Sequence, residues 1–311
     1  MSLSATVIQD LYREASIDHT RVGAEDVARL VINHGEVVDA HGVDGIVLEV
    51  NEIADGVDIS FTVEEGAVIA KPVHMCFGML PEQGLQKIIM AVNVRRGAKV
   101  AVQAHCVFPN AVDVVHAMDA VINIEAGGDY RYFERHVHGA GGIRVVPKAR
   151  ITVGENARFS TEFELIRGPV GVIDIDYEIE ALAHSVVDML ARIRGQGDDV
   201  IKIREAARLT GAYARGVLTS KIALRDRARA DIFSEMTGAA AYARGHVDCK
   251  EIIQGHAVGR AVPIVEVCHP QAHITHEAAI GSVDTKQLET LMSRGLSEEE
   301  ASDIIIAGLL S

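Results

Sequence analysis

Metal-binding side chains alternate in the middle of the chain, where Glu134, His136 and His138 occupy every second position. Residues two apart on a β-strand point to the same face, so a strand here would bring the three side chains together. Two imidazoles and one carboxylate are a donor set that divalent transition metals use. One hypothesis is therefore a site for a divalent metal ion, completed by His105 or His116 from a neighbouring segment. The alternative is an exposed polar face of a sheet, which fits the same alternation.

A second group of metal-binding side chains, His273, His276 and Glu277, ends a valine-rich region. Because adjacent residues of a regular strand point in opposite directions, His276 and Glu277 share one site only if the backbone breaks there. Otherwise one of them serves a partner molecule. The four cysteines contain no CxxC pair and are interpreted as reduced thiols. Cys106 continues an apolar alternation and is expected in the core, and Cys268 is expected to be a buried small apolar residue.

The elements that position these side chains change in period along the chain. Apolar residues recur at helical spacing in Ser4–Ile17 and in Ala24–His34, and Gly35 is the expected C-cap of the second helix. From Gly45 the period becomes two, and short Val- and Ile-rich runs alternate with turn sequences. The word AYARG occurs at 212 and again at 241, an internal echo that suits successive coils of a β-solenoid. A β-sandwich fits the periodicity equally well.

After Gly281 the period returns to helical. Asp284 is expected to N-cap a helix that ends at Gly295, and Ser297 with Glu300 forms the capping box of a second helix. The second helix carries an apolar stripe, which must pack on the β-region or on a partner: Ala301, Ile304, Ile305 and Leu309.

The composition limits which kinds of core, partner and enzyme class are compatible with this sequence. Aromatic residues make up 4% of the chain and Trp is absent, so the core must consist mainly of Val, Ile, Ala and Leu. The net charge of −14 repels nucleic acid and anionic membrane surfaces, which are excluded as partners. Without a secretory signal or a bilayer-length apolar run, the sequence predicts a soluble, cytoplasmic protein. P-loop, dinucleotide-binding, GxSxG and HExxH motifs do not occur, so the corresponding enzyme classes lack support.

The stretch from Glu266 to Leu310, which ends in HEAAIGSVDTKQLETLMSRGLSEEEASDIIIAGLL, resembles the C-terminal signature of the SufB/SufD scaffold proteins of iron–sulfur cluster assembly. In that signature a His-Glu-Ala or His-Gly-Ala step leads to a Ser-Arg-Gly turn and an acidic helix. The resemblance is dense in this stretch and looser back to about residue 45. The chain is short for the family, and Ile274 stands where SufD-type proteins have a cysteine.

The resemblance implies a mainly β fold, a right-handed parallel β-helix (β-solenoid) over residues 45–282 between helical segments 1–44 and 283–311. It implies a non-enzymatic scaffold that holds a nascent iron–sulfur cluster through Cys249, His276 and Glu277. A SufC-like ABC ATPase would dock on the C-terminal helices, and the chain would pair with a second copy or with a paralogous subunit. The alternative function is a metal-dependent enzyme of β-helical or cupin-like build around Glu134, His136 and His138.

Overall fold

The computed structural model describes residues 3–311. The helices are α1 (Leu3–Glu14), α2 (His19–Val22), α3 (Thr285–Met292) and α4 (Glu298–Leu309). One sheet, called sheet A here, contains β1 (Arg29–Asn33), β2 (Glu36–His41), β5 (Val73–Gly78), β7 (Lys99–Phe108), β9 (Asp129–His138), β11 (Arg158–Leu165), β13 (Val186–Gly195), β15 (Arg215–Leu224), β17 (Arg244–Ile253) and β19 (His273–Gly281). The other, sheet B, contains β3 (Ile46–Ile53), β4 (Gly56–Val63), β6 (Gln83–Val94), β8 (Asp113–Ile124), β10 (Ile143–Val153), β12 (Gly171–Ala181), β14 (Val200–Leu209), β16 (Arg229–Gly238) and β18 (Val258–Val267). None of the described helices is long and apolar enough to span a membrane.

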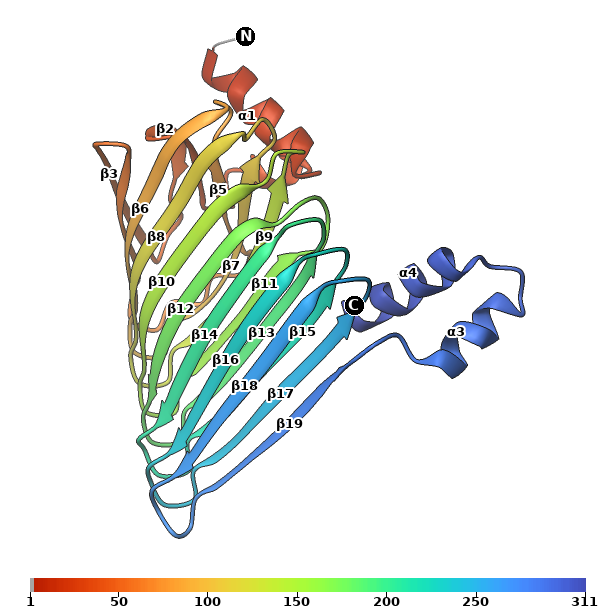
Figure 1. Cartoon of the computed structure of the whole chain (residues 1–311). Helices are drawn as coiled ribbons and strands as arrows, with labels where there is room; N and C mark the ends of the chain where they lie inside the picture. The colour runs from red at the N-terminus through yellow and green to blue at the C-terminus, as the bar shows by residue number, and fades with distance from the viewer. Residues whose placement is uncertain (1–2) are drawn as a thin grey trace.

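From β4 onward, successive strands alternate between the two sheets, so each pair of strands makes one coil of a flattened solenoid (Figure 1). Within each sheet these strands pair in parallel with the strands one coil before and one coil after. Arg215 pairs with Arg244, and Arg244 with His273, so one coil takes 29 residues in this region. The predicted parallel β-solenoid is confirmed, and the sandwich alternative is wrong.

The core lies between the two sheets and follows from the period-two pattern. In β12, for example, Ile173, Ile175, Tyr177 and Ile179 are buried, whereas the residues that alternate with them are only partly buried. Full burial of such a side chain contributes about 1.5–3 kcal/mol, and each coil repeats the arrangement on both sheets. Small and β-branched side chains fill the narrow space between the sheets, which accounts for the scarcity of aromatic residues.

The AYARG echo marks the same corner in successive coils. Tyr213 and Tyr242 both adopt positive φ, 62° and 58°, in the turns that lead into β15 and β17. Their rings stack with centroids 4.8 Å apart, and His184 from the preceding coil stacks on Tyr213 at 5.1 Å. The recurrence therefore reflects a repeated left-handed turn conformation and a ladder of stacked rings, as expected for a solenoid.

One of the two predicted N-terminal helices is confirmed, namely α1. The prediction of a helix over Ala24–His34 is wrong, because this segment contains strand β1 and a turn into β2. Leu30, Val31 and Ile32 are fully buried because β1 faces the core on one side and the α1 cluster on the other. A strand buried on both faces reads as a continuous apolar run, which over a short length resembles helical spacing.

The C-terminal helices begin where their capping residues predict. The Asp284 carboxylate accepts a hydrogen bond from the backbone N–H of Gln287 at 2.8 Å. Ser297 and Glu300 form the predicted capping box of α4. These local signals depend on a few neighbouring residues only, so the sequence determines them without knowledge of the fold.

The buried face of α4 differs from the predicted stripe. Ala301 of the predicted stripe is buried, but Ile304 is 49% exposed, and Ser302, Ile306 and Leu310 are buried at intervals of four residues. This face packs on the outer surface of sheet A, against Ala223 and the partly buried Ile252. The apolar surface available on the sheet, and not the helix alone, selects the face. By contrast, α3 has no buried residue and projects from the solenoid (Figure 1).

Candidate functional site

The predicted ligands Cys249, His276 and Glu277 lie on the last two strands of sheet A. β17 and β19 pair in parallel, with Val247 opposite His276, Asp248 opposite Glu277 and Cys249 opposite Ala278. Val247 and Cys249 are buried in the core, so the side chains at odd-numbered positions of this part of β17 point inward. Paired residues of a parallel sheet point the same way, and therefore His276 faces inward with Cys249 whereas Glu277 faces outward.

The expected backbone break between His276 and Glu277 does not occur. β19 is a regular strand from His273 to Gly281, and its ladder with β17 is continuous over nine residue pairs. The two side chains therefore cannot meet at one point within a single chain.

Cys249 lies inside the solenoid beneath the terminal coil. Its side chain is fully buried, and Sγ lies 3.9 Å from the hydroxyl of Ser234 on β16. Burial raises the pKa of the Cys249 thiol, so the closed solenoid disfavours the thiolate that a metal needs. The thiol becomes a good ligand only if water or a metal ion reaches it.

A buried carboxylate that the sequence analysis missed lies beside this thiol. Glu251 is 2% exposed, two residues after Cys249 on the same inward face, and neither of its carboxylate oxygens has a hydrogen-bond partner. Burial, reinforced by Asp231, raises its pKa to about 7. Glu205, on β14, is also buried, and burial raises its pKa to about 7 as well. The sequence signal for this carboxylate is the spacing of Cys249 and Glu251, which lie two residues apart and therefore share one face of a strand.

The end of the solenoid beyond these residues is open. No further coil follows β18 and β19 in the described chain, so inward-pointing apolar residues reach the surface. Val265 and Val267 on β18 are 37% and 52% exposed, and Ile280 on β19 is 45% exposed. An apolar surface next to unpaired strand edges is the kind of surface that a partner covers.

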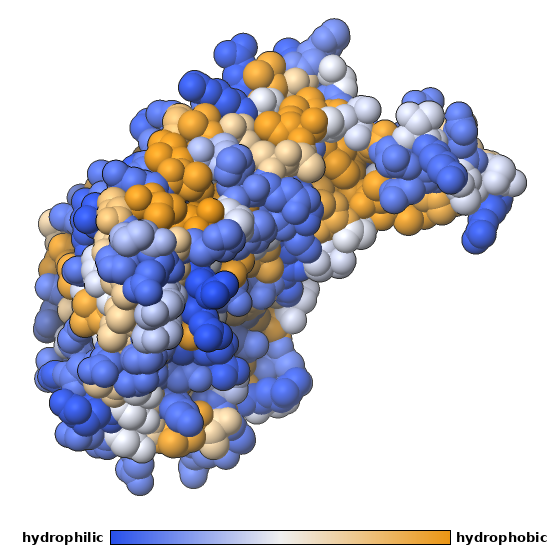
Figure 2. Space-filling view, turned by 90° about the horizontal axis from the view of Figure 1, so that it is seen from below, coloured by the Kyte–Doolittle hydropathy of each residue, from blue (hydrophilic) through white to orange (hydrophobic). Residues whose placement is uncertain are grey.

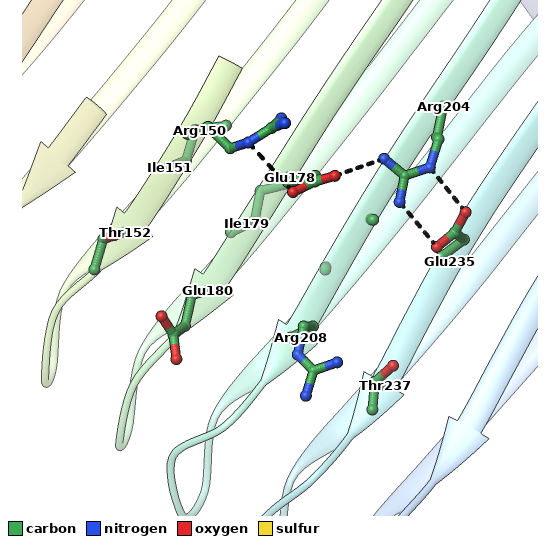
Figure 3. A pocket seen from close by; sticks show the side chains of 12 residues that line it. Arg150, Ile151, Thr152, Glu178, Ile179, Glu180, Arg204, Arg208, Glu235 and Thr237 are labelled. Carbon is green, nitrogen blue, oxygen red and sulfur yellow. Dashed lines mark hydrogen bonds and ion pairs between the residues drawn. The ribbon is translucent and has the colours of Figure 1, made fainter. Parts of the chain in front are cut away.

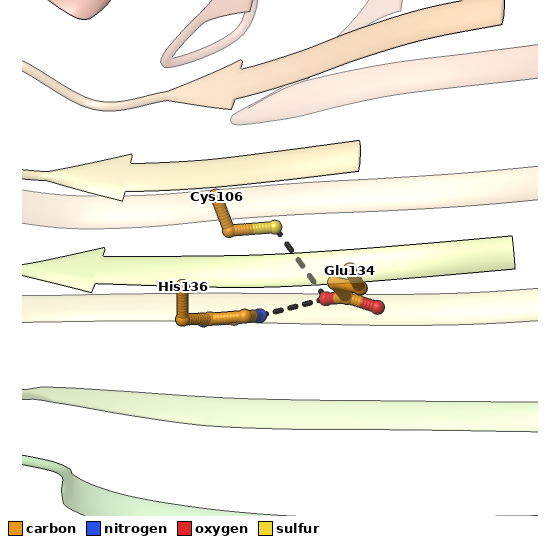
Figure 4. Close-up of side chains that lie close together, drawn as sticks. All are labelled: Cys106, Glu134 and His136. Atoms are coloured by element: carbon orange, nitrogen blue, oxygen red, sulfur yellow. Dashed lines mark hydrogen bonds and ion pairs between the residues drawn. The ribbon is translucent and has the colours of Figure 1, made fainter. Parts of the chain in front are cut away.

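The central group Glu134, His136 and His138 lies inside the solenoid, on the inward face of β9. All three side chains are less than a tenth exposed, so the alternative of an exposed polar face is wrong. Cys106 from the neighbouring strand β7 lies beside Glu134 and His136 (Figure 4). Sγ of Cys106 lies 3.5 Å from Oε1 of Glu134, and Nε2 of His136 lies 2.7 Å from the same oxygen.

The other candidates take different places. His105 pairs with Arg135 in register and points outward, where it contacts His74 at 3.2 Å, so it does not join the central group. His116 does join it, with Nε2 3.9 Å from the Cys106 sulfur. Cys106 is in the core as predicted. The prediction for Cys268 is wrong, since it is exposed in the turn after β18 at the open end.

The outer face of sheet B carries a shallow depression of about 450 Å³ (Figure 3). Arg204 lies within it and binds Asp176, Glu178 and Glu235 at 2.8–3.0 Å. Burial is incomplete here, and such surface ion pairs contribute about 0–1 kcal/mol each. The charges satisfy one another across neighbouring coils, which indicates a structural role on the solenoid surface.

Comparison with known proteins agrees with the fold and with the C-terminal signature. The family model described as "SUF system FeS cluster assembly, SufBD core domain" matches residues 82–309. An iron–sulfur cluster assembly SufBD family protein of Methanocaldococcus jannaschii is 35% identical over 283 residues, which cover 91% of this chain and 90% of the relative. A protein of the same description from Pyrococcus horikoshii is 32% identical over 301 residues, covering 97% and 92%. The match spans nearly the whole of both relatives, and this chain belongs to the SufBD family of iron–sulfur cluster assembly proteins.

Proposed function

We propose that this chain is a non-enzymatic scaffold on which an iron–sulfur cluster is built, with Cys249 as its thiolate ligand. The observation that carries the proposal is the position of Cys249 and His276, which share the inward face of the last two strands at the open end of the solenoid. Nascent clusters need soft thiolate ligands, and an imidazole is a suitable labile ligand for a cluster that must leave. Both donors come from one face of one sheet.

Assembly on Cys249 requires the terminal coil to move. The thiol is fully buried, and its raised pKa keeps it protonated. Displacement of β18 and β19 would admit water and iron, return the thiol pKa toward its ordinary value near 8.5 and increase its thiolate fraction. In this proposal a SufC-like ABC ATPase supplies that movement, and the cluster is cargo and not a resident cofactor.

A second copy of this chain is the proposed partner at the open end. The exposed apolar residues Val265, Val267 and Ile280 and the free edge of β19 form the surface. The outward Glu277 of each subunit is then available to the partner's cluster site. We further propose that the complex works in the cytoplasm, where its four cysteines, all unpaired in the structure, stay reduced.

The ATPase is proposed to bind the arm formed by α3 and α4. α4 is anchored to sheet A, because Asp303 pairs with Arg194 and Arg225. α3 has no buried residue, and Met292 and Ile304 are 41% and 49% exposed. Figure 2 shows apolar atoms along one side of the projecting arm. Because α4 is anchored to sheet A, movement of a partner bound to the exposed apolar side of the arm would displace the strands beneath α4.

Anaerobic reconstitution with iron and sulfide tests the cluster site. The wild-type chain should give a brown product with thiolate-to-iron charge-transfer absorption, and Cys249→Ser should remove most of it. Cys268→Ser is the matched control, because this cysteine is exposed at the same end of the molecule and is not a proposed ligand. A colourless wild-type product, or absorption insensitive to Cys249→Ser, would refute the proposal.

Co-purification with a SufC-type ATPase tests the arm. Removal of Asp284–Ser311 should abolish binding, but it also uncovers Ala223 and Ile252. Met292→Asp and Ile304→Asp are therefore the sharper variants, since neither side chain is buried. Val112→Asp, at a 64% exposed position far from the arm in sequence, is the control. Binding that survives the double substitution would exclude the arm as the docking site.

The burial of the central group argues against a metal-dependent enzyme. Glu134, His136 and His138 are 3%, 2% and 7% exposed inside the solenoid, so a substrate has no access to a metal held there.

A further inference from the structure

A continuous chain of polar side-chain contacts crosses the solenoid interior near its middle, and backbone carbonyls fix its two ends. The chain runs through Gln86, His116, Cys106, Glu134, His136 and His138. A carbonyl oxygen only accepts, so each end dictates which ring nitrogen of the next histidine carries hydrogen. These two ends fix the orientations of His116 and His138.

At the first end, the side-chain amide of Gln86 donates to the carbonyls of His34 and Gly78, both at 2.8 Å. Both amide hydrogens are thereby used, and Oε1 is left to accept from Nδ1–H of His116 at 2.9 Å. The other ring nitrogen of His116, Nε2, is thereby turned toward the Cys106 sulfur, at 3.9 Å.

At the second end, Nδ1–H of His138 donates to the carbonyl of Pro169 at 3.0 Å. On the other side of the His138 ring, Nε2 lies 3.2 Å from Nδ1 of His136. The remaining nitrogen of His136, Nε2, then faces Oε1 of Glu134 at 2.7 Å. An imidazole nitrogen and a carboxylate oxygen at this distance share a proton, and the same two atoms can bind a metal ion in its place.

We propose that Cys106, Glu134 and His136 bind one divalent transition-metal cation of the zinc or iron(II) class, with His116 as the fourth donor. The ligand atoms of the first three lie within 4.8 Å of one another. Donors at about 2.0–2.3 Å from a tetrahedral ion are separated by roughly 3.3–3.6 Å. The Cys106–Glu134 separation of 3.5 Å lies in that range, and the Glu134–His136 separation of 2.7 Å must widen when the ion binds. In the metal-free protein a single proton occupies the same position.

The donor chemistry selects the metal class. One sulfur, one carboxylate oxygen and imidazole nitrogens suit zinc, cobalt and iron(II), whereas calcium and magnesium prefer oxygen donors alone. Gln86 and His138 hold the outer ring nitrogens of His116 and His136, an arrangement that orients histidines toward metals. The site differs from the one that the sequence predicts, because Cys106 enters it, His138 supports it from behind and His105 lies outside it.

The site joins both sheets. Cys106 and Glu134 belong to β7 and β9 of sheet A, and His116 belongs to β8 of sheet B. A bound ion therefore links the two faces of the solenoid, and it should raise the melting temperature of the chain. This site lies on strands remote from Cys249 and does not depend on cluster assembly there.

Cobalt(II) titration of the chelator-treated full chain tests the proposal. One equivalent should bind and give visible d–d bands with a thiolate-to-cobalt charge-transfer band, and zinc or iron(II) should displace it. Separate displacement titrations with zinc and with iron(II) establish which of these two ions binds more tightly. Cys106→Ser should abolish the charge-transfer band and weaken binding by on the order of 100-fold or more, while Cys76→Ser and Cys249→Ser should retain the band.

X-ray absorption of the wild-type cobalt or zinc form keeps the test independent of variant folding. One sulfur with nitrogen or oxygen neighbours supports the site. Absence of stoichiometric uptake, a coordination shell without sulfur, or a charge-transfer band that persists in Cys106→Ser and disappears in Cys249→Ser would overturn it.

Discussion

Around Cys106 and around Cys249, the same alternation places a thiol and a carboxylate inside the solenoid, yet the two regions satisfy these groups differently. Near Cys106, Glu134 and three histidines bind one another in a chain that ends on backbone carbonyls. Near Cys249, both oxygens of Glu251 lack partners, as does the hydroxyl of Ser220. Unsatisfied buried groups cost about 1–3 kcal/mol each. The region around Cys106 is therefore expected to stay closed, and the region around Cys249 to open more readily.

Removing Glu134 should give the largest effect. Glu134→Ala leaves Nε2 of His136 buried without a partner and should lower the free energy of unfolding by about 3–5 kcal/mol. Glu134→Gln can donate to that nitrogen, so it should retain most of the stability while losing the metal. Denaturant unfolding at pH 7 measures both. Glu251→Ala is the matched control and should cost much less, because no partner is lost; equal losses at the two sites would remove the contrast.

The pH dependence of stability should reveal the unsatisfied carboxylates. Burial raises the pKa of Glu205 from 4.5 to about 7, so the folded state holds a proton that the unfolded state releases. Its stabilising effect is complete below pH 4.5 and is lost as pH rises toward 7, a change of about 3 kcal/mol. The difference in unfolding free energy between Glu205→Gln and wild type should therefore shift by that amount between pH 4.5 and pH 8. A pH-independent difference would contradict the raised pKa.

Thiol labelling should show the smallest effect. Only the terminal coil covers Cys249, whereas several coils lie on either side of Cys106. Local opening near a solenoid end requires less free energy than opening in the middle. Cys249 should react about tenfold faster than Cys106 under native conditions, a difference of ~1.4 kcal/mol in opening free energy. Mass spectrometry of the labelled peptides measures the rates, with the exposed Cys268 as the fast reference; faster labelling of Cys106 would reverse the assignment of the two regions.

The sequence predicted the fold well where information is local or periodic. The caps at Asp284 and Ser297 depend on side chains three residues away, and the AYARG echo reports one coil of the solenoid directly. β1 was predicted as a helix because its burial on both faces depends on α1 and β5, which no local pattern reveals. The face of α4 depends on the outer surface of sheet A in the same way.

The candidate sites were predictable in part. Alternation correctly grouped Glu134, His136 and His138 on one face, but it does not say whether that face is inside or outside. Cys106 is 28 residues from Glu134 and meets it only because one coil has about that length. Glu251 was missed because a carboxylate in a β-run is usually on the solvent face. The opposite orientations of His276 and Glu277 followed from period two and hold in the structure.

The hairpins at the start of the solenoid limit how the molecule can assemble. β2 and β3 return antiparallel along their neighbours and are the edge strands there, and they carry Glu36, Asp39, Glu49 and Glu52. Charged edges of this kind resist further strand addition. The opposite end, with β18 and β19, has an exposed apolar surface. A solenoid with only one end suited to association can bind one other solenoid through that end. Pairing at this end would therefore give a closed two-fold dimer and not a fibre.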